Sequence, residues 1–460
     1  MKHIHLIGIG GTGMSSIARV LLEKGFTVSG SDRALSSLAR DLQKVGVHVI
    51  IGHSAANIQG ADTVVRSSAV SDDNLEVQAA VRAGIPVLKR AEFLPLLMKD
   101  HTGVAVAGTH GKTTTTAMLV WALYSLGYDP TFILGGVSMN LGLNAHAGKG
   151  KYFVLEADEY DRMFLGLHPQ VEVITNVEYD HPDCFPTPLD YRNAFEQFAG
   201  CLTPGGLLIT NHDDHGSAQL KNQLQADSHC FSTGLRPGAD YRASEIRSNS
   251  IGGFTFTVQF EAGKQKPEPL TVVSLQIPGE HNVRNALQVI AALHQMGIPV
   301  NQAAQSLSEF KGTGRRFELV GEANGISIIN DYAHHPTKIR ATLAAARSRY
   351  PGRRLVAVWQ PHTFSRTQTL ESQFINSLGN ADLVLVTEVY GAREQSTDYS
   401  AKSLVQKTGR QNVIFTDTLA ETTEILLQKL EPGDVLVILS AGDADQICND
   451  VLKQLKEREV

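Results

Sequence analysis

Hydrophobic positions in the first hundred residues follow two kinds of pattern. Short apolar runs predict strands at residues 4–9, 27–30, 48–51, 63–67 and 87–89. Between the first two runs, apolar side chains at positions 14, 17, 18, 21 and 22 recur with the spacing of one helix face. Strands that alternate with helices predict a parallel sheet with crossover helices. We therefore expect a Rossmann-like α/β domain over residues 1–98.

A second block, residues 99–316, starts with the same alternation and then changes its period. Strands are predicted at residues 104–107, 132–134, 152–156, 171–175 and 207–210. Over residues 254–260, apolar and polar residues alternate strictly, and positions 273, 275 and 277 repeat that alternation. Strict alternation indicates antiparallel strands with one buried face. We expect a central domain whose parallel sheet carries a small antiparallel part, followed by a helix over residues 283–293.

The third block, residues 317–460, again alternates strands with helices. Strands are predicted at residues 326–329, 355–359, 383–387, 413–415 and 435–439. A helix is expected over residues 338–347, and Pro336 lies near its first turn, where proline is tolerated. This pattern predicts a second Rossmann-like, doubly wound domain. The glycine-rich residues 311–314 are the expected joint between the second and third domains.

Composition narrows the classes of function. The 460 residues are 42% hydrophobic and 19% charged, which is typical of a globular enzyme. The 41 lysines and arginines are spread along the chain, so no basic stripe indicates a nucleic-acid partner. No apolar run reaches the roughly 20 residues of a membrane span, and the start of the chain does not fit a signal peptide. Its four cysteines form no C-x-x-C pair, which favours reduced thiols and a cytoplasmic location.

The strongest chemical motif follows the predicted strand at 104–107 and precedes a helix. It comprises Gly108, Thr109, His110, Gly111, Lys112, Thr113 and Thr114. A strand, a glycine loop, Lys-Thr and a helix form a phosphate-binding arrangement, here in the short spacing G-x-x-G-K-T. Lys112 can reach the outer phosphates and the Thr113 hydroxyl can hold Mg²⁺. The alternative interpretation is a glycine-rich turn that binds nothing.

Another glycine loop, the first along the chain, lies at residues 8–13. Gly8, Gly10 and Gly13 fit G-x-G-x-x-G after a predicted strand, and Asp32 lies 19 residues beyond Gly13. Alone, this pattern indicates dinucleotide binding. Physically it indicates only a pyrophosphate at a helix N-terminus, which NAD and a nucleotide-diphosphate sugar both present. We favour a UDP-type ligand, because no hydride-transfer site is evident downstream.

Acidic and histidine residues follow two of the central strands. Residues 156–161 read E-A-D-E-Y-D and residues 176–181 read N-V-E-Y-D-H. In open α/β sheets the ligand lies beyond the carboxyl ends of the strands, so both segments should reach one site. Glu156 is then a candidate ligand for Mg²⁺, and His181 gains interest because it converges on the same region. A solvated acidic loop is the alternative.

Three further segments have open interpretations. His281 and Asn282 stand at the start of the predicted helix, where Asn282 either caps the helix or helps to read a base edge. Arg315 and Arg316 adjoin the second joint, where they either clamp a phosphoryl group after domain closure or form an interdomain ion pair. Residues 331–336 and 360–366 follow strands of the third block, where ligand contacts are expected.

Taken in order, these motifs resemble the Mur ligases over nearly the whole chain. The matching segments are G-I-G-G-T-G-M-S (8–15), G-S-D (30–32), S-S-A-V (67–70), G-T-H-G-K-T-T (108–114), E-A-D-E-Y-D (156–161), N-V-E-Y-D-H (176–181), G-E-H-N-V-R-N-A (279–286), G-R-R-F-E (314–318), D-Y-A-H-H-P-T (331–337) and Q-P-H-T-F-S-R-T (360–367).

The resemblance implies a bacterial enzyme of peptidoglycan precursor synthesis with UDP-sugar, ATP and C-terminal domains. The implied reaction joins L-alanine to the carboxylate of UDP-N-acetylmuramate through an acyl phosphate, with ATP and Mg²⁺ as cofactors and ADP and phosphate as products. Such activation makes physical sense, because a carboxylate oxygen must first become a good leaving group.

The resemblance also implies roles for individual residues. The catalytic set is Lys112, Arg316, His334, His335, His362 and Arg366. ATP contacts are implied for the phosphate loop and for His281, Asn282 and Asp331. Mg²⁺ contacts are implied for Thr113, Glu156 and His181. The set implied for the UDP-sugar is Gly8, Gly10, Gly11, Gly13, Met14, Ser15, Asp32, Ser67 and Ser68.

Three positions depart from the usual family pattern, namely Arg66, Ala333 and Thr363. Thr363 leaves the contact to the amino-acid carboxylate open. Two other enzymatic functions are weighed: a related ligase that attaches an intact tripeptide to UDP-N-acetylmuramate, and a nicotinamide-dependent oxidoreductase built on residues 8–13. A third alternative is a nucleotide-binding switch without catalysis.

Overall fold

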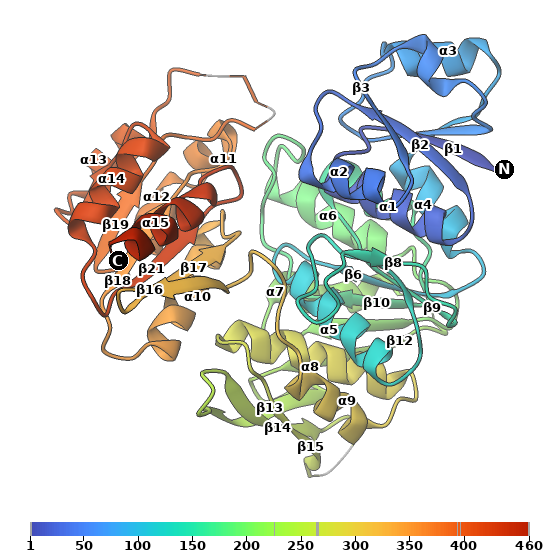
Figure 1. The fold of residues 1–460 in the computed structure, drawn as a ribbon. Coiled ribbons are helices and arrows are strands. Elements are labelled where there is room, and N and C mark those ends of the chain that lie inside the picture. Colours follow the sequence, from blue (N-terminus) through green and yellow to red (C-terminus); the bar gives the residue numbers. More distant parts are fainter. Residues whose placement is uncertain (1, 225, 264–265, 393, 396, 459–460) are drawn as a thin grey trace.

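The computed structural model describes residues 2–224, 226–263, 266–392, 394–395 and 397–458. Three separate sheets, each flanked by helices, divide the chain as the hydrophobic pattern predicts (Figure 1). The blue N-terminal part lies above the green and yellow central part, and the orange to red C-terminal part lies beside it (Figure 1). The predicted α/β fold of three domains is confirmed.

The N-terminal sheet is parallel throughout, in the order β3-β2-β1-β4-β5. Its elements are β1 (His3–Ile7), α1 (Thr12–Glu23), β2 (Thr27–Asp32), α2 (Ser37–Lys44), β3 (His48–Ile51), η1 (Ala55–Ile58), β4 (Thr63–Arg66), α3 (Leu75–Arg82), β5 (Val87–Lys89) and α4 (Arg90–Met98). The first strand ends earlier than the predicted residue 9, because Gly8 turns the backbone with φ +81°. Strand order reverses between β1 and β4, which is where ligands bind in such sheets.

The central sheet has the order β15-β14-β13-β12-β11-β10-β6-β9-β7-β8. Strands β13 to β7 in this order run parallel, and β14, β15 and β8 are antiparallel to their neighbours. The predicted antiparallel part is therefore confirmed and continues the parallel sheet, but its last strand covers residues 268–274 and not positions 275 and 277 as predicted. The elements are β6 (Thr102–Ala107), α5 (Lys112–Ser125), β7 (Thr131–Ile133), β8 (Ala145–His146), β9 (Tyr152–Glu156), η2 (Tyr160–Gly166), β10 (Val171–Ile174), α6 (Pro188–Ala199), β11 (Leu207–Asn211), α7 (His215–Gln219), η3 (Leu220–Gln223), β12 (His229–Gly234), β13 (Tyr241–Ser248), β14 (Phe254–Phe260), β15 (Glu268–Ser274), α8 (Glu280–Gln295) and α9 (Val300–Ser308).

The C-terminal sheet has the order β16-β17-β21-β18-β19-β20, with every pair parallel except β16 and β17. Its elements are β16 (Glu318–Ala323), β17 (Ile326–Asp331), α10 (Pro336–Arg349), β18 (Leu355–Trp359), α11 (Phe364–Thr369), α12 (Glu371–Ser377), β19 (Leu383–Val386), α13 (Ala401–Thr408), β20 (Val413–Phe415), α14 (Leu419–Lys429), β21 (Val435–Leu439) and α15 (Gln446–Glu457). The hydrophobic pattern missed β16. Asn324 and Gly325, both at positive φ, form the tight turn that pairs β16 with β17.

The hydrophobic cores show which domains pack against each other through apolar side chains. One buried cluster runs from Ile4 and Ile17 of the N-terminal domain to Phe153 and Phe195 of the central domain. The C-terminal domain instead has two clusters of its own, around Trp359 and Ile438. The first two domains thus share apolar packing, whereas the third contacts them mainly through polar groups.

The predicted joint at residues 311–314 is held against the central domain. Lys311 N donates to Asn140 Oδ1 at 2.8 Å, and Gly314 N donates to the Val137 carbonyl at 2.9 Å. Immediately beyond, Arg315 and Phe317 take positive φ values of 56° and 51°. The unusual backbone conformation therefore lies just after the glycines. Among the described residues, no helix combines the length and apolar character that a membrane span needs.

Candidate functional site

A cleft of about 1030 Å³ lies where the three domains meet. Thr12 and Gly13 line it from the N-terminal domain, Lys112 and Glu156 from the central domain, and Arg316 from the C-terminal domain. The carboxyl ends of β6, β9 and β10 open into it. The cleft thus brings together the motifs that lie far apart in the sequence.

The phosphate loop joins β6 to α5 in a shape that only glycine allows. Gly108 and Gly111 have φ values of +130° and +84°. A Cβ on Gly108 would lie 2.0 Å from Thr175 Oγ1, and one on Gly111 would lie 2.7 Å from Asn285 Oδ1. Both glycines are therefore needed for backbone conformation and for close packing. Because Gly111 is the N-cap of α5, the loop amides and the positive helix end face the cleft.

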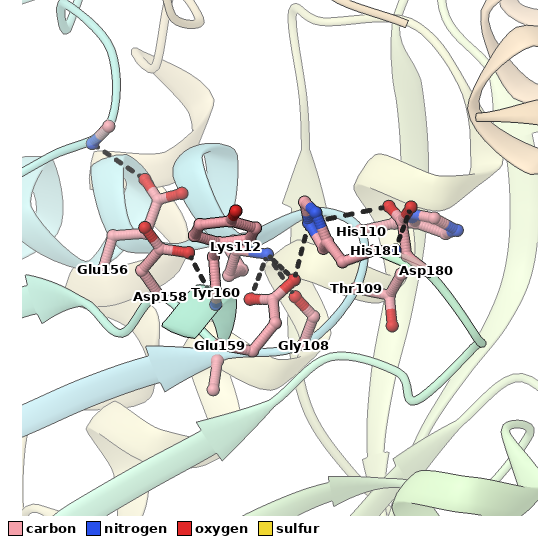
Figure 2. Close-up of polar contacts among 12 residues, drawn as sticks. Gly108, Thr109, His110, Lys112, Glu156, Asp158, Glu159, Tyr160, Asp180 and His181 are labelled. Atoms are coloured by element: carbon pink, nitrogen blue, oxygen red, sulfur yellow. Dashed lines mark hydrogen bonds and ion pairs between the residues drawn. The ribbon is translucent and has the colours of Figure 1, made fainter. Parts of the chain in front are cut away.

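Lys112 is held beside a buried carboxylate. Its Nζ donates to the Gly108 carbonyl at 2.6 Å and lies 2.9 Å and 2.7 Å from the two carboxylate oxygens of Glu159 (Figure 2). Burial alone would lower the pKa of Lys112, but the carboxylates of Glu159, Glu156 and Asp158 raise it. The ammonium group therefore stays charged at the mouth of the loop.

Thr113 and Glu156 form the pair of oxygen donors that the sequence predicts. Thr113 Oγ1 donates to Glu156 Oε1 at 3.0 Å, and Gly135 N donates to the other oxygen at 2.8 Å. A hydroxyl and a carboxylate, both hard oxygen donors, fit the preference of Mg²⁺. The backbone of Gly135 also orients the carboxylate. These two residues therefore suit a magnesium ion on a bound nucleotide.

His181 lies near this pair but has other partners. Its Nε2 is 3.8 Å from Glu159 Oε1, and its Nδ1 accepts from Arg366 Nη2 at 3.4 Å. Burial lowers the pKa of His181, so the ring is neutral and carries its proton on Nε2 in this arrangement. Ligation through Nε2 would require that proton to leave. His181 thus differs from Thr113 and Glu156, whose oxygens are ready donors.

Arg366 crosses from the C-terminal to the central domain. Its Nε donates to Asp180 Oδ1 at 2.6 Å, and both side chains are buried. Burial would raise the pKa of Asp180, but the charge of Arg366 keeps it well below its usual value. The predicted catalytic residue Arg366 is therefore part of a buried interdomain ion pair.

A second interdomain contact surrounds His110. Its Nε2 is hydrogen-bonded to Glu178 Oε2 at 2.7 Å, and its ring centroid lies 4.6 Å from that of His335. Thr337 Oγ1 donates to the other oxygen of Glu178 at 2.7 Å. Ligand atoms of His110, Glu178 and His335 lie within 4.8 Å of one another. However, His335 Nδ1 accepts from Thr337 N, which leaves the proton of a neutral ring on Nε2. We therefore interpret the cluster as polar packing between domains.

Arg316 and Asp331 lie at the same domain boundary. Arg316 Nη2 donates to Thr113 Oγ1 at 3.4 Å, and its guanidinium lies 4.6 Å from the centroid of the Tyr332 ring. Asp331 accepts from the Phe317 amide at 2.8 Å. Burial raises the pKa of Asp331, although Arg316 opposes that shift. The structure thus places Arg316 beside the phosphate loop, as expected of a charge that acts on phosphate.

His281 and Asn282 stand in the first turn of α8. The N-cap of this helix is Gly279, so Asn282 is not the cap that one interpretation allowed. Instead, its amide donates to the Pro278 carbonyl at 2.6 Å and its oxygen accepts from Asn285. Burial lowers the pKa of His281 to about 4, which leaves a neutral ring that lines the cleft.

The remaining predicted histidines lie on the C-terminal side. Ring centroids of His334 and His362 are 5.7 Å apart, and His362 stacks on Tyr390 at 5.8 Å. Burial and nearby cations keep the pKa of His334 well below its usual value. Thr363 has a φ of 67°, which is uncommon for a β-branched residue. His334 and His362 line the cleft, whereas His335 is fully buried behind it.

The first glycine loop faces the other end of the cleft. Asp32 Oδ2 accepts from the Gly10 amide at 2.8 Å, so Asp32 braces this loop. A Cβ on Gly8 would lie 3.1 Å from Ser67 Cβ, whereas one on Gly11 would make only an ordinary contact, at 3.5 Å from the Gly8 carbonyl oxygen. Ser68 is exposed, while the side chains of Met14 and Ser15 are buried. Met14 and Ser15 can therefore offer only backbone groups to a ligand.

Several site residues escaped sequence reasoning. Glu159, Glu178 and Asp180 lie inside segments that were singled out, yet no role was assigned to them. Lys338 and Arg90 lie outside the motifs, although both line the cleft. Burial lowers the pKa of Lys338 to about 7, and repulsion from the nearby cations Lys112, Arg316 and Arg366 contributes to that shift. The only sequence signal was position: each follows a strand or begins a helix at the carboxyl edge of a sheet.

Comparison with known proteins agrees with this geometry. Three family models match consecutive parts of the chain: "Mur ligase family, catalytic domain" over residues 3–102, "Mur ligase middle domain" over 106–293 and "Mur ligase, glutamate ligase domain" over 315–442. The UDP-N-acetylmuramate–L-alanine ligase of Bordetella petrii is 42% identical, with 97% of each chain covered.

Solved structures show the same likeness. The UDP-N-acetylmuramate–alanine ligase of Thermotoga maritima matches with a TM-score of 0.83 at 30% identity and full coverage of both chains. A murein peptide ligase of Psychrobacter arcticus matches with a TM-score of 0.73 at 28% identity, with 99% of each chain covered. With matching domain models along its length and relatives that align from end to end, the chain belongs to the Mur ligase family.

Proposed function

We propose that this enzyme joins L-alanine to the lactyl carboxylate of UDP-N-acetylmuramate, with hydrolysis of ATP to ADP and phosphate, in peptidoglycan precursor synthesis. One observation supports this most: the Lys112–Glu159 and Thr113–Glu156 pairs share a cleft with the first glycine loop and with C-terminal residues. A nucleotide, a UDP-sugar and an amino acid can therefore meet there. The full-length identity to alanine ligases supports the choice of substrates.

The proposed chemistry has two steps. A carboxylate oxygen of the sugar substrate attacks the γ-phosphorus of ATP, and the bond to the bridging oxygen breaks to release ADP. The alanine nitrogen then attacks the acyl carbon, and the carbon–oxygen bond breaks to release phosphate, while the nitrogen loses its surplus proton. Activation is required because a free carboxylate has no adequate leaving group.

Residues of the phosphate loop would stabilise the first step. Lys112 and Arg316 can offset negative charge that develops on the transferring group. Mg²⁺, held by Thr113 and Glu156 with His181 as the third proposed ligand, would supply further positive charge on the phosphates. Since Arg316 comes from another domain, its position relative to Thr113 depends on domain contact.

The C-terminal residues would act on the second step. His334, His362 and Arg366 face the cleft on the side from which alanine would enter. His281, Asn282 and Asp331 are proposed to contact the nucleotide, and residues 8–15 with Asp32, Ser67 and Ser68 the UDP-sugar. Contact between domains also excludes water, which would otherwise hydrolyse the acyl phosphate.

We also propose domain limits of 1–98, 99–316 and 317–460, and a location in the bacterial cytoplasm. The limits follow the division into three sheets. The location follows from the proposed substrates, which are cytoplasmic precursors. Neither nucleic acid nor membrane is a partner in this proposal.

A phosphate-release assay tests the function. Wild-type protein is mixed with ATP, Mg²⁺ and UDP-N-acetylmuramate, and then with L-alanine, glycine, L-serine or the murein tripeptide in turn. The proposal expects release that depends on UDP-N-acetylmuramate and is fastest with L-alanine. Faster phosphate release with the tripeptide would instead indicate that the enzyme attaches an intact peptide, as the name of the murein peptide ligase of Psychrobacter arcticus implies for that protein. Quenching of NADH fluorescence by the protein, without phosphate release, would favour the oxidoreductase.

A further inference from the structure

Arg90 lies at the junction between the first glycine loop and the acidic segment of the central domain. It is the first residue of α4, directly after the edge strand β5. A Cβ built on Gly13 would lie 2.0 Å from Arg90 Nη1, so the guanidinium rests on the first turn of α1. In this conformation Arg90 thus occupies the space that a side chain at position 13 would take.

This position is unfavourable for a cation unless an anion joins it. The N-terminus of α1 has no side-chain cap and no acidic residue in its first turn. Its free amides and the positive end of its dipole therefore face the cleft. A guanidinium placed there adds a second positive charge to the same spot.

The existing partners of Arg90 leave this charge poorly compensated. Its Nη2 lies 3.3 Å from Asp158 Oδ2, and the Asp158 side chain is 40% exposed. The Arg90 side chain is itself 20% exposed, so the pair is only partly buried, and solvent screens the attraction between the two charges. In addition, Arg90 Nε is buried without a hydrogen-bond partner among the described residues. One donor of the guanidinium fork is thus unused.

We propose that Arg90 binds the diphosphate of the UDP-sugar, together with the amides at the start of α1. This inference rests on the proposed function and adds a residue that the family motifs do not include. A planar guanidinium donates two parallel hydrogen bonds to phosphate oxygens, which an ammonium cannot do. The diphosphate would replace Asp158 as the main partner of Arg90.

Two roles of Arg90 can be told apart: binding of phosphate, and an ion pair with Asp158 that only joins the domains. If the pair with Asp158 only holds the two domains together, loss of either partner should have the same effect. If Arg90 binds phosphate, Asp158 competes with the ligand. Removal of its charge should then strengthen binding.

Binding is measured by calorimetry on the full chain with UDP, UDP-N-acetylmuramate and ATP as separate ligands. The variants are Arg90→Gln, Arg90→Lys and Asp158→Asn. Arg82→Gln serves as the matched control, because Arg82 is an exposed arginine of the same domain. We expect Arg90→Gln to weaken UDP about ten- to a hundredfold, as for a lost hydrogen bond to a charged group.

The same variant should leave ATP affinity within about twofold of wild type. Arg90→Lys should lie between wild type and Arg90→Gln, because it keeps the charge and loses the fork. Asp158→Asn should tighten UDP binding by about two- to fivefold on loss of a like charge. If Arg90→Gln does not fold, Arg90→Lys decides the question.

Three results would overturn the inference. One is unchanged UDP affinity in Arg90→Gln or, should that variant not fold, in Arg90→Lys. Another is equal weakening by Arg90→Gln and Asp158→Asn. The third is a loss for UDP-N-acetylmuramate with none for UDP, which would place Arg90 on the sugar carboxylate. Failure of wild-type protein to bind UDP would instead contradict the proposed function.

Discussion

The two glycine loops of this enzyme share a pattern and differ in what surrounds them. Both follow a central strand and begin a helix. At residues 108–114, Lys112 is fixed by a buried carboxylate at 2.7 Å, and further carboxylates gather beside it. Beside residues 8–13, Arg90 is instead paired with a half-buried carboxylate, that of Asp158, at 3.3 Å.

Under the proposed function, one local motif would serve two purposes. A site that carries out chemistry needs charges that are fixed before the reaction, because reorganisation would raise the barrier. A site that only binds can leave its donors for the ligand to satisfy. We therefore expect changes at the second loop to lower turnover and changes at the first loop to weaken substrate binding.

The largest effect should follow from Lys112→Ala. Turnover should fall about a hundredfold or more, because a charge that stabilises the transferring phosphoryl is lost. Glu159 would also lose its cation, so the melting temperature is measured beside phosphate release. The comparison predicts that UDP affinity stays near wild type. Near-normal turnover would remove Lys112 from the mechanism.

At the first loop, Gly10→Val should raise the KM for the UDP-sugar about tenfold or more and leave the KM for ATP unchanged. A Cβ on Gly10 would lie 2.9 Å from both Asp32 Oδ2 and Ser36 Oγ, so these side chains, which brace the loop, or the loop itself must shift. Gly11→Ala is the matched control, since its Cβ would meet only an ordinary contact at 3.5 Å. Its effect should be clearly smaller. A rise in the KM for ATP would mean that the loops were assigned to the wrong ligands.

His181→Gln tests how far the metal site extends. If His181 ligates Mg²⁺ in the active complex, the Mg²⁺ concentration for half-maximal activity should rise about tenfold, as for a weakened metal site. Because Arg366 donates to its Nδ1 in the present structure, an unchanged Mg²⁺ requirement is the result that packing alone predicts. Titration of activity with Mg²⁺ at saturating ATP distinguishes the two.

The last prediction concerns the pH dependence of stability rather than turnover, and it involves Lys338, which lines the cleft with Lys112. Burial and the cations Lys112, Arg316 and Arg366 lower the pKa of Lys338 from 10.5 to about 7. Between these values the unfolded chain binds a proton that the folded chain does not. The free energy of unfolding therefore rises with pH across that window, because the deprotonated Lys338 no longer opposes folding.

Lys338→Met should accordingly flatten the slope of unfolding free energy against pH between about 7 and 10. Lys402→Met, at an exposed lysine of α13, is the control and should keep the wild-type slope. Denaturant unfolding of both variants at several pH values gives the comparison. If Lys338→Met and wild type have the same slope, the pKa of Lys338 is not lowered in the folded protein.

The hydrophobic pattern predicts six strands with the limits that the structure shows, and three of them, at 152–156, 355–359 and 435–439, are almost fully buried. The strands at 48–51, 87–89, 152–156, 355–359, 413–415 and 435–439 have the predicted limits. The pattern failed to predict β8, β12 and β13 of the central sheet, and also β16, whose residues are only partly buried and show no clear period. It also extended β1 into Gly8, since hydrophobicity alone cannot show where a glycine turns the backbone.

The candidate site was predictable where chemistry resides in adjacent residues. Lys112 and Thr113 were predicted from the G-x-x-G-K-T spacing between a strand and a helix, and Glu156 from its place after a strand. Partners from distant segments could not be predicted in the same way. Nothing in the sequence joins Asp180 to Arg366, or Gly13 to Arg90, although each pair is in contact.

By itself, then, the sequence determined the three α/β domains, the family and the positions of the two glycine loops. Those features depend on local periodicity and on glycines whose backbone freedom acts within a few residues. Only the tertiary structure decided which charges are paired, which donors remain free and which histidines are neutral. Such properties depend on burial and on distances between segments that are far apart in the chain, and burial changes the cost of every charge.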